Sequence, residues 1–572
     1  MRPNRTRDMR LNLSHLPLPL LFCFSILPCL PVRVAAQQAA SPTAPAPDSS
    51  ALPSTALASS GVAAEPKKEP AGPPPSPLIV GISLFRAREF NAAGAKLTEA
   101  TGSTAIVSPK AYAWLARTDL HLHKVEDAET AARKAIELDP NLPIAQSALA
   151  EVYFRQAKFA EAESILRKLA AANQADGREC LSLARLHWAT ANNKGAKVCI
   201  DLAHKMDPDD PDIYRDWVST LPWRERLEEW KKRLALGKFD DDEHEREGLT
   251  AAISVLEDEE KQTQHACRLA LKTLPSETSL APLQVDAKRL RGYGLTVKVN
   301  DTSSKLLVDT GASGILINSK IAEKAGVTKI SDRHIGGIGD RGASTGYVGF
   351  AKKLQVGSLV FEDCYVDVVD KKNSLGEDGL VGTDVFADFL VDLDLPNTKL
   401  RLSELPPFPD QPAATPGLQL SQTGSKTLHN RWIPPQFASY EKVYRFGHML
   451  LIPGFINDSP PRLFLVDTGG WDNFITPAAA KGVTKLSNSD TIVKGLSGKV
   501  AKVYSTGDVT LVFGHFKQQR DDMVAFDMTH ISNNVGTEIS GSLGFAMLYL
   551  LDIKIDYRDH LVDFSYDPNR FH

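Results

Sequence analysis

Two stretches of the chain end an apolar run with the same tripeptide, Asp-Thr-Gly. The first run, residues 306–308, leads into Asp309, and the second, residues 463–466, leads into Asp467. Each run has the length and composition of a buried strand. A carboxylate at the end of a buried strand is costly unless a neighbouring group stabilises it. Two such carboxylates that face each other can share a proton and activate a water molecule for hydrolysis.

The sequence around the two tripeptides also repeats. A strand and a polar Asn-Asp turn precede each apolar run, at Asn300 and at Asn457. A second apolar stretch, a short helical segment and a glycine-rich stretch follow each tripeptide in the same order. A late apolar motif then ends at Gly382 in the first copy and at Gly544 in the second. Such an ordered set of shared features predicts a duplicated β-rich domain.

With these motifs, residues 283–572 resemble the pepsin and retropepsin superfamily of aspartic peptidases, in which Asp-Thr-Gly precedes a hydrophobic-hydrophobic-glycine element. The resemblance implies two all-β lobes, over residues 283–404 and 441–572. It also implies that Asp309 and Asp467 are the catalytic pair of an aspartic endopeptidase. The chemistry of such a pair requires no cofactor and no metal, because one carboxyl stays protonated while the other acts as general base on a water.

The resemblance extends to the residues that follow each aspartate. The hydroxyls of Thr310 and Thr468 are expected to brace the two active-site loops against each other. Gly311 and Gly469 are expected to let the backbone approach the carboxyls, since a side chain there would obstruct it. These four residues are therefore predicted to support the active-site loops.

The glycine-rich residues 335–347 are expected to form a flap that closes over a bound peptide, with Tyr347 as its aromatic tip. The second copy departs from the family pattern at Trp471, which is unusual there and can leave Asp467 without its outer hydrogen-bond partner. Two hypotheses therefore stand. One is an active aspartic endopeptidase, and the other is a catalytically inactive peptidase-like protein that binds peptides or partner proteins.

Low-complexity stretches separate the parts of the chain. Residues 405–440 are proline-rich and predict a linker between the lobes, long enough for the two aspartates to pair within one chain. Residues 37–77, rich in Ala, Pro and Ser, predict a disordered linker. Residues 1–36 combine arginines, an apolar core and small residues, as a secretory signal peptide does. The mature protein is expected to be exported, periplasmic or extracellular, with no membrane span.

Residues 78–275 show a helical pattern with an internal repeat. Leu-Ala pairs recur with a constant step at Leu115, Leu149 and Leu183. A period of about 34 residues resembles the tetratricopeptide (TPR) repeat and implies an all-α solenoid. The predicted fold class is thus multidomain α plus β. Such an array either binds a partner protein on its concave surface or acts as a spacer or dimerisation arm.

Composition restricts other functions. The formal net charge of −4 over 572 residues argues against a nucleic-acid partner. The resemblances to aspartic peptidases and to TPR repeats imply a peptide or protein substrate and a possible protein partner of the repeats. The spacing of His and Cys residues predicts no metal site, and His121 and His123 are expected at the surface of the solenoid. A bridge between Cys180 and Cys199 is one possibility. Buried free thiols are the favoured state of the four cysteines after residue 36.

Overall fold

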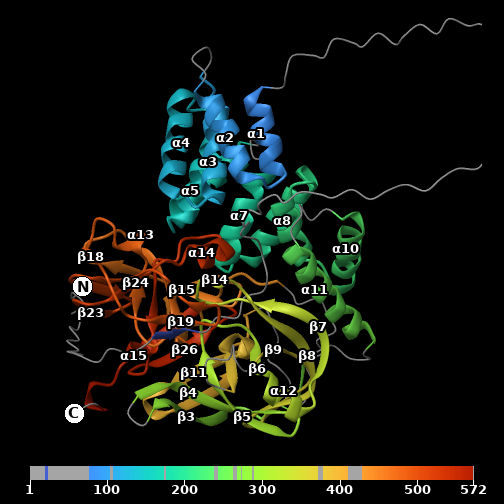
Figure 1. Ribbon diagram of the computed structural model, residues 1–572, viewed down its shortest axis with the longest axis vertical. Coiled ribbons are helices and arrows are strands. Elements are labelled where there is room, and N and C mark those ends of the chain that lie inside the picture. The colour runs from blue at the N-terminus through green and yellow to red at the C-terminus, as the bar shows by residue number, and fades with distance from the viewer. Residues whose placement is uncertain are drawn as a thin grey trace, which may run out of the picture.

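A computed structural model of the chain has helices in its N-terminal part and strands in its C-terminal part (Figure 1). The helices form an array that stands on two β-rich lobes. The predicted fold class, a TPR-like solenoid followed by a two-lobed β domain, is therefore confirmed. The described residues are 20–22, 76–102, 107–172, 176–237, 243–261, 267–271, 273–286, 289–370, 378–409 and 428–570.

Most of the predicted N-terminal extension lies outside these residues. The expected signal peptide, residues 1–36, contributes only the strand β1 (Leu20–Phe22) to the described part of the chain. The expected linker, residues 37–77, contributes its last two residues, where α1 begins. Within the described ranges, no helix is both long and apolar enough to cross a membrane.

Helices of the array pack in consecutive pairs and then against the next pair. Prolines at the first turn and polar N-caps begin several of them; for example, the side chain of Ser108 accepts from the backbone N–H of Ala111 at 3.3 Å, and Pro109 follows the cap. The bounds are α1 (Pro77–Arg86), α2 (Phe90–Thr101), α3 (Pro109–His121), α4 (Val125–Leu138), α5 (Pro143–Arg155), α6 (Phe159–Ala171), α7 (Gly177–Ala189), α8 (Asn193–Met206), α9 (Pro211–Ser219), α10 (Trp223–Leu236) and α11 (Glu243–Lys261).

The repeat is also visible in the backbone. His123, Ala157 and Ala191 occupy equivalent turns of successive helix pairs, and their φ angles are 63°, 61° and 56°. Ala116 and Ala150, at equivalent positions where helices cross, are both fully buried. Small side chains at these crossings allow the close helix packing of the solenoid.

The two histidines predicted to be exposed are half-buried instead. The ring of His121 stacks on Phe90 with centroids 4.2 Å apart, and its Nε2 lies 3.6 Å from Asp212. Burial lowers the pKa of His121 to about 3 and that of His123 to about 4. For His121 the surface prediction was wrong because α3 and α9, which are distant in sequence, approach each other.

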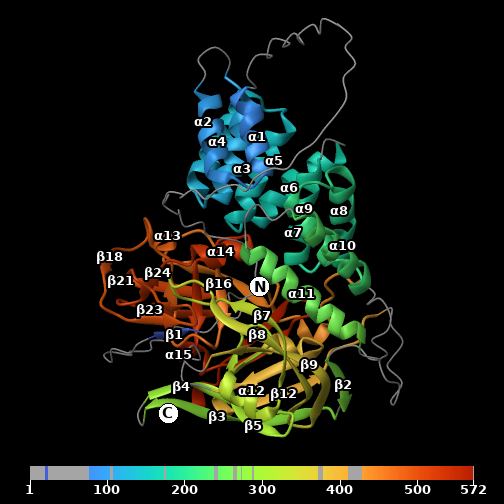
Figure 2. The same ribbon diagram turned by 45° about the vertical axis from the view of Figure 1, so that its right-hand side comes forward.

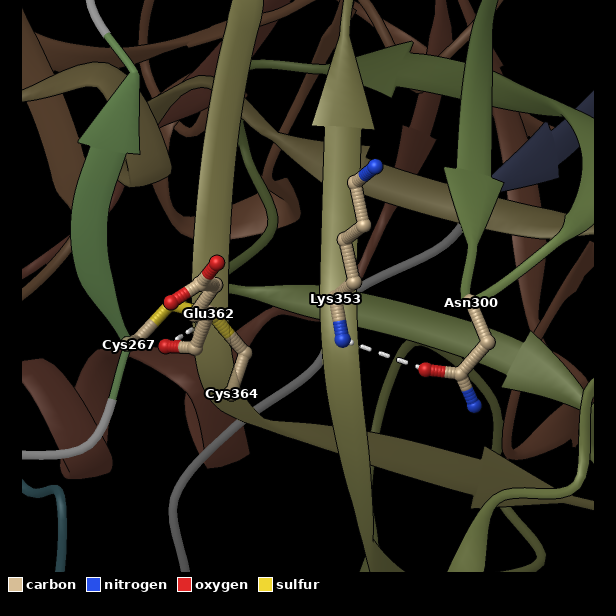
Figure 3. The surroundings of a disulfide bond; sticks show 5 residues. All are labelled: Cys267, Asn300, Lys353, Glu362 and Cys364. Atoms are coloured by element: carbon tan, nitrogen blue, oxygen red, sulfur yellow. Dashed lines mark hydrogen bonds between the residues drawn. A yellow bond between two sulfur atoms is a disulfide. The ribbon is translucent and has the colours of Figure 1, made fainter.

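The helical region ends earlier than residue 275. After α11, strands β2 (Arg268–Leu271) and β3 (Ser276–Asp286) already belong to the β-rich half, so the first lobe begins before residue 283. A four-residue strand has no periodicity that separates it from a helical turn. Here β2 is held by pairing with β9 (Leu359–Val369) and by a disulfide between Cys267 and Cys364 (Figure 3).

That disulfide corrects the expectation that all four cysteines are free. Cys267 and Cys364 lie 97 residues apart in sequence, so nothing in their spacing indicates the bond. Cys180 and Cys199 are free thiols, and Cys180 is buried, as was favoured for this pair.

The two lobes repeat one strand order. In the first lobe it is β4-β5-β10-β6-β9-β8-β7, and in the second it is β15-β16-β25-β17-β24-β21-β18. The first-lobe elements are β4 (Arg289–Val299), β5 (Thr302–Asp309), β6 (Ile315–Asn318), α12 (Ser319–Ala325), β7 (Thr328–Ile335), β8 (Ser344–Val356), β9, β10 (Gly379–Gly382) and η1 (Thr383–Phe386). Those of the second lobe are β14 (Tyr444–Phe446), β15 (Met449–Ile456), β16 (Arg462–Asp467), β17 (Phe474–Ile475), α13 (Pro477–Ala480), β18 (Leu486–Asn488), β19 (Val493–Gly495), β20 (Gly498–Lys499), β21 (Val503–Thr506), β22 (Val509–Phe513), β23 (Phe516–Arg520), β24 (Val524–Phe526), α14 (Thr529–Val535), β25 (Gly541–Gly544) and α15 (Phe545–Leu548).

Equivalent asparagines turn the chain before each active-site strand. Asn300 and Asn457 both have φ 51°, a left-handed conformation that asparagine tolerates. The side-chain oxygen of Asn300 accepts from the backbone N–H of Lys353 (3.1 Å, Figure 3), and that of Asn457 accepts from Thr510 (2.7 Å). Each asparagine thereby ties the β4–β5 or β15–β16 hairpin to a neighbouring strand of its own lobe.

One sheet joins the lobes. Strand β11 (Phe389–Asp394) of the first lobe pairs antiparallel with β26 (Asp552–Asp556) of the second. Both lobes therefore belong to a single folded unit of one chain, as the connector length indicated. The sheet is completed by β3, β12 (Lys399–Glu404), β13 (Glu441–Lys442) and β27 (Leu561–Ser565). Short 3-10 turns lie at η2 (Leu395–Asn397), η3 (Pro435–Phe437) and η4 (Pro568–Arg570).

The helical array packs directly on the second lobe. The rings of Phe159 and Tyr444 lie 4.4 Å apart, and Arg155 forms an ion pair with Glu538 at 2.6 Å. The hydroxyl of Thr537 donates to the carbonyl of Phe154 at 3.0 Å. Helix α11 lies along β7 of the first lobe (Figure 2). The array thus contacts both lobes.

Candidate active site

The two aspartates of the repeated tripeptide meet where the lobes join. Asp309 is the last residue of β5 and pairs with Gly382 of the parallel strand β10, and Asp467 is the last residue of β16 and pairs with Gly544 of β25. Both carboxyls are fully buried. The equivalent strand orders of the lobes therefore place one carboxyl from each lobe at the junction.

Reciprocal hydrogen bonds between two threonines hold this junction. The backbone N–H of Thr310 donates to Oγ1 of Thr468 at 3.1 Å, and the N–H of Thr468 donates to Oγ1 of Thr310 at 3.0 Å. Each hydroxyl then donates across the junction, from Thr310 to the carbonyl of Val466 (2.7 Å) and from Thr468 to that of Val308 (2.8 Å). Both threonines lie where the sequence analysis placed them, bracing one loop on the other.

The backbones of Gly311 and Gly469 lie against the two carboxyls. The N–H of Gly311 donates to Oδ1 of Asp309 at 2.9 Å, and that of Gly469 donates to Oδ1 of Asp467 at 2.9 Å. A Cβ atom on Gly469 would lie 2.2 Å from Cγ of Asp309. Only a glycine leaves room there for the carboxyl of the opposite lobe.

Beside Trp471, Oδ1 of Asp467 keeps its backbone donors, while Oδ2 has no hydrogen-bond donor among the described residues apart from the facing carboxyl. Oδ1 of Asp467 accepts from two amides, those of Gly469 and Gly470, the second at 3.0 Å. The indole of Trp471 packs near the ring of Phe545, with centroids 5.8 Å apart. The departure from the family pattern therefore leaves the backbone donors of this carboxyl in place.

The environment favours one proton on the pair. Burial, and next the charge of Asp467, raise the pKa of Asp309 well above its ordinary value. Burial also raises the pKa of Asp467 to about 6, although the backbone amides oppose the shift. Apart from the facing carboxyl, no donor of the described residues reaches Oδ2 of either aspartate. Asp309 is accordingly the carboxyl that holds a proton most strongly.

Two further polar side chains reach across the junction, and the sequence analysis missed both. Nη1 of Arg291, in β4, donates to the carbonyl of Gly469 at 2.8 Å. Nε2 of His448, directly before β15, donates to the carbonyl of Gly311 at 3.1 Å. Arg291 and His448 precede Asn300 and Asn457 by the same number of residues, so aligning the two hairpins pairs them, but their burial is visible only in the structure.

The segment predicted to be a flap is the hairpin of β7 and β8, but Tyr347 is not at its tip. Tyr347 lies within β8, paired with Asp332 of β7, and its half-buried ring packs on the first-lobe core beneath Lys329. The tip is the loop between these strands, where Ile338 is fully buried. The aromatic ring of Tyr347 buries apolar surface against the core of its own lobe, which an exposed loop tip would not allow.

The flap tip contacts an equivalent loop of the second lobe. The N–H of Gly337 donates to Oγ of Ser497 at 3.0 Å, the N–H of Ser497 donates to the carbonyl of Ile338 at 3.0 Å, and the N–H of Arg341 donates to the carbonyl of Ser497 at 2.9 Å. These loops come from corresponding places in the two lobes. The structure thus has its paired loops in contact and its carboxyls fully buried.

Among the described residues, no group of three or more His, Cys, Asp or Glu side chains is arranged to hold a metal ion. Asp384, near the pair, is held by the loop that follows Asp309. Oγ of Ser313 donates to Asp384 at 2.9 Å.

Two family models match parts of the chain. Residues 295–385, which include Asp309, match an aspartyl protease model, and residues 123–183 match a tetratricopeptide repeat model. The chain therefore combines a TPR region with an aspartyl protease domain.

Similar curated proteins match over short regions. The chain is 28% identical over 137 residues to DNA damage-inducible protein 1 of Kluyveromyces lactis, covering 24% of this chain and 30% of that protein. It is 32% identical over 108 residues to the protein of the same name from Neurospora crassa, covering 18% of this chain and 24% of that one. The chain thus spans less than a third of either relative.

Solved structures resemble each part separately. An aspartic proteinase from Irpex lacteus aligns with a TM-score of 0.32 and 14% identity, over 52% of this chain and 98% of the other. A TPR protein from Thermus thermophilus aligns with a TM-score of 0.26 and 21% identity, over 31% of this chain and 97% of the other.

The contact between Gly469 and Asp309 predicts the effect of a single methyl group. In Gly469→Ala the carboxyl of Asp309 must move, and displacement of a reacting group by about 1 Å lowers a rate by roughly 100-fold. For a site that hydrolyses peptides with this pair, we expect kcat/KM to fall by at least that factor. Gly507→Ala is the matched control, because the nearest atom to its added Cβ lies 3.5 Å away. Full activity in Gly469→Ala would contradict the described contact.

Burial of Asp467 predicts a pH-dependent gain in stability when the carboxyl is removed. Its folded pKa, about 6, exceeds the unfolded value near 4, so stability is lost as pH rises through this interval. Asparagine cannot ionise, and Asp467→Asn should therefore raise the free energy of unfolding at pH 7.5 by roughly 2 to 3 kcal/mol.

Urea unfolding at pH 7.5 and pH 4 measures this difference, which should shrink to less than about 0.5 kcal/mol at the lower pH, because Asp467 is then protonated in the folded state and about half protonated in the unfolded state. Asp458→Asn, at an exposed aspartate in the turn before β16, is the control and should show little change at either pH. An Asp467→Asn variant that is no more stable than the parent at pH 7.5 refutes the expected cost of burial.

Proposed function

We propose that the chain is an aspartic endopeptidase that hydrolyses peptide bonds with a water molecule activated by Asp309 and Asp467. The observation that carries this proposal is the buried pair of carboxyls, one from each lobe, braced by reciprocal threonine hydrogen bonds. The aspartyl protease model that matches the first lobe supports the same reaction class.

The difference in pKa assigns one carboxyl as the general base and the other as the proton donor. Asp467, with the lower pKa, ionises first and acts as general base, taking a proton from water while the water oxygen attacks the peptide carbonyl. Asp309 gives its proton to the carbonyl oxygen, which yields a neutral tetrahedral intermediate. The intermediate collapses when Asp467 passes its proton to the leaving nitrogen and Asp309 recovers one from a hydroxyl. Water is thereby added across the C–N bond, and the protons balance.

Substrate access requires the two contacting loops to separate. The hydrogen bonds between Gly337, Ile338 and Ser497 join the loops of opposite lobes, and no surface of either carboxyl is exposed while they persist. Loops that open for substrate and close over it exclude water from the reaction. We therefore assign the loop pair as the gate of the proposed site.

The TPR region is proposed to recruit a protein. Repeat arrays present extended surfaces to partner proteins, and this array is held in place on the lobes by the Arg155–Glu538 ion pair and the Phe159–Tyr444 contact. Inside the array, Arg178 forms ion pairs with Asp210 and Asp212, so these three side chains already have partners within the chain.

Peptide cleavage tests the proposed activity. The full chain should cleave a mixed peptide library between roughly pH 3 and 8, the range in which a carboxyl pair titrates. Asp309→Asn and Asp467→Asn should each lose turnover, with Asp458→Asn unchanged, and a statine-type inhibitor should block the parent. A folded parent protein that cleaves nothing but binds library peptides would favour the alternative function, a peptidase-like binding protein.

Export to an oxidising compartment is proposed from two features. Residues 1–36 have the pattern of a signal peptide, and Cys267 and Cys364 form a disulfide, a bond that persists in such compartments. Expressed in a Gram-negative host, the protein should appear in the periplasmic fraction with its N-terminus just after residue 36. A cytoplasmic protein that retains its N-terminal residues, identified by mass spectrometry, would contradict export.

A further inference from the structure

Arg291 and His448 occupy equivalent positions in the two lobes but differ in chemistry. Each crosses to the opposite lobe and donates to the carbonyl of the glycine in its Asp-Thr-Gly tripeptide, Gly469 and Gly311 respectively. A guanidinium carries a permanent positive charge. The imidazole is neutral near pH 7, because burial lowers the pKa of His448 even though Asp384 opposes the shift. The duplicated fold thus places one fixed cation beside the carboxyl pair.

The location of Arg291 makes its charge important. Its side chain is only 3% exposed, and a buried cation is costly without a compensating negative charge. The carbonyl that it contacts belongs to Gly469, whose Cα packs against the carboxyl of Asp309. A pair of carboxyls with one proton carries a single negative charge, and the nearby positive charge of Arg291 stabilises that state relative to the fully protonated one.

Three other ionisable groups near the pair, Tyr557, Asp384 and Arg445, have different partners from Arg291. Tyr557 is fully buried near Asp309, and its hydroxyl is hydrogen-bonded to Thr383. Asp384 and Arg445 act on His448 and Tyr557. Arg291 acts on both members of the pair, lowering the pKa of Asp309 and of Asp467 against the effect of burial.

We propose that Arg291 is a positioning residue that keeps the carboxyl pair in its singly protonated state, while His448 is a neutral brace at the equivalent place. This role rests on the proposed peptidase function. It adds a group that sets the pH range in which the pair is competent, through a charge and not through contact with the substrate.

Arg291→Gln is the direct test, because glutamine keeps a donor for the carbonyl of Gly469 and removes the charge. Loss of the cation disfavours ionisation of the pair, so both limbs of the kcat/KM pH profile should move to higher pH by about one unit. Arg291→Lys restores a cation and should return the profile toward that of the parent. His448→Gln, the matched variant in the other lobe, should leave the limbs in place.

A second measurement needs no turnover. The pH dependence of urea unfolding is compared between each variant and the same variant carrying Asp309→Asn and Asp467→Asn, which isolates proton uptake by the pair. The midpoint of that uptake should rise in Arg291→Gln and not in His448→Gln. Coincident midpoints in Arg291→Gln and the parent, or equal shifts in the two glutamine variants, would overturn the proposal. An inactive parent would refute the proposed function, yet the unfolding series would still test Arg291.

Discussion

The placement of two carboxyls inside the protein is the constraint on which the rest of the site depends. Asp309 and Asp467 are both fully buried, and charge in such a place is tolerated only with nearby donors and limited ionisation. Backbone amides of Gly311 and Gly469 supply the donors, and the reciprocal bonds of Thr310 and Thr468 fix the distance between the lobes. The shared sheet through β11 and β26 keeps the two halves in this register.

Much of this arrangement could be predicted from the sequence because the duplication preserves order. The apolar runs, the Asn turns and the Asp-Thr-Gly tripeptides identified the paired strands and the residues at their ends. Periodicity identified the helical repeats, since the small residues at helix crossings recur with the repeat. These features are local in sequence, and local patterns are what a single sequence reveals.

Features that depend on distant contacts could not be predicted in the same way. The disulfide between Cys267 and Cys364 joins residues far apart in the chain, and it secures a strand too short to have a pattern. His121 becomes half-buried because α9, distant in sequence from α3, brings Asp212 to it. Arg291 was missed for another reason: an arginine near the start of a strand usually lies at the surface, and its burial follows only from the meeting of the lobes.

Fusion of the two lobes in one chain has a consequence for the N-to-C direction in which a peptide can bind. Two identical subunits would form a cleft with a twofold axis, in which a peptide could lie N-to-C either way with the same neighbours. Here Ser313 of one lobe corresponds to Trp471 of the other, and Arg291 corresponds to His448. A peptide bound between the lobes, as proposed, would therefore meet different side chains in its two orientations, and the site could distinguish the polarity of the peptide backbone.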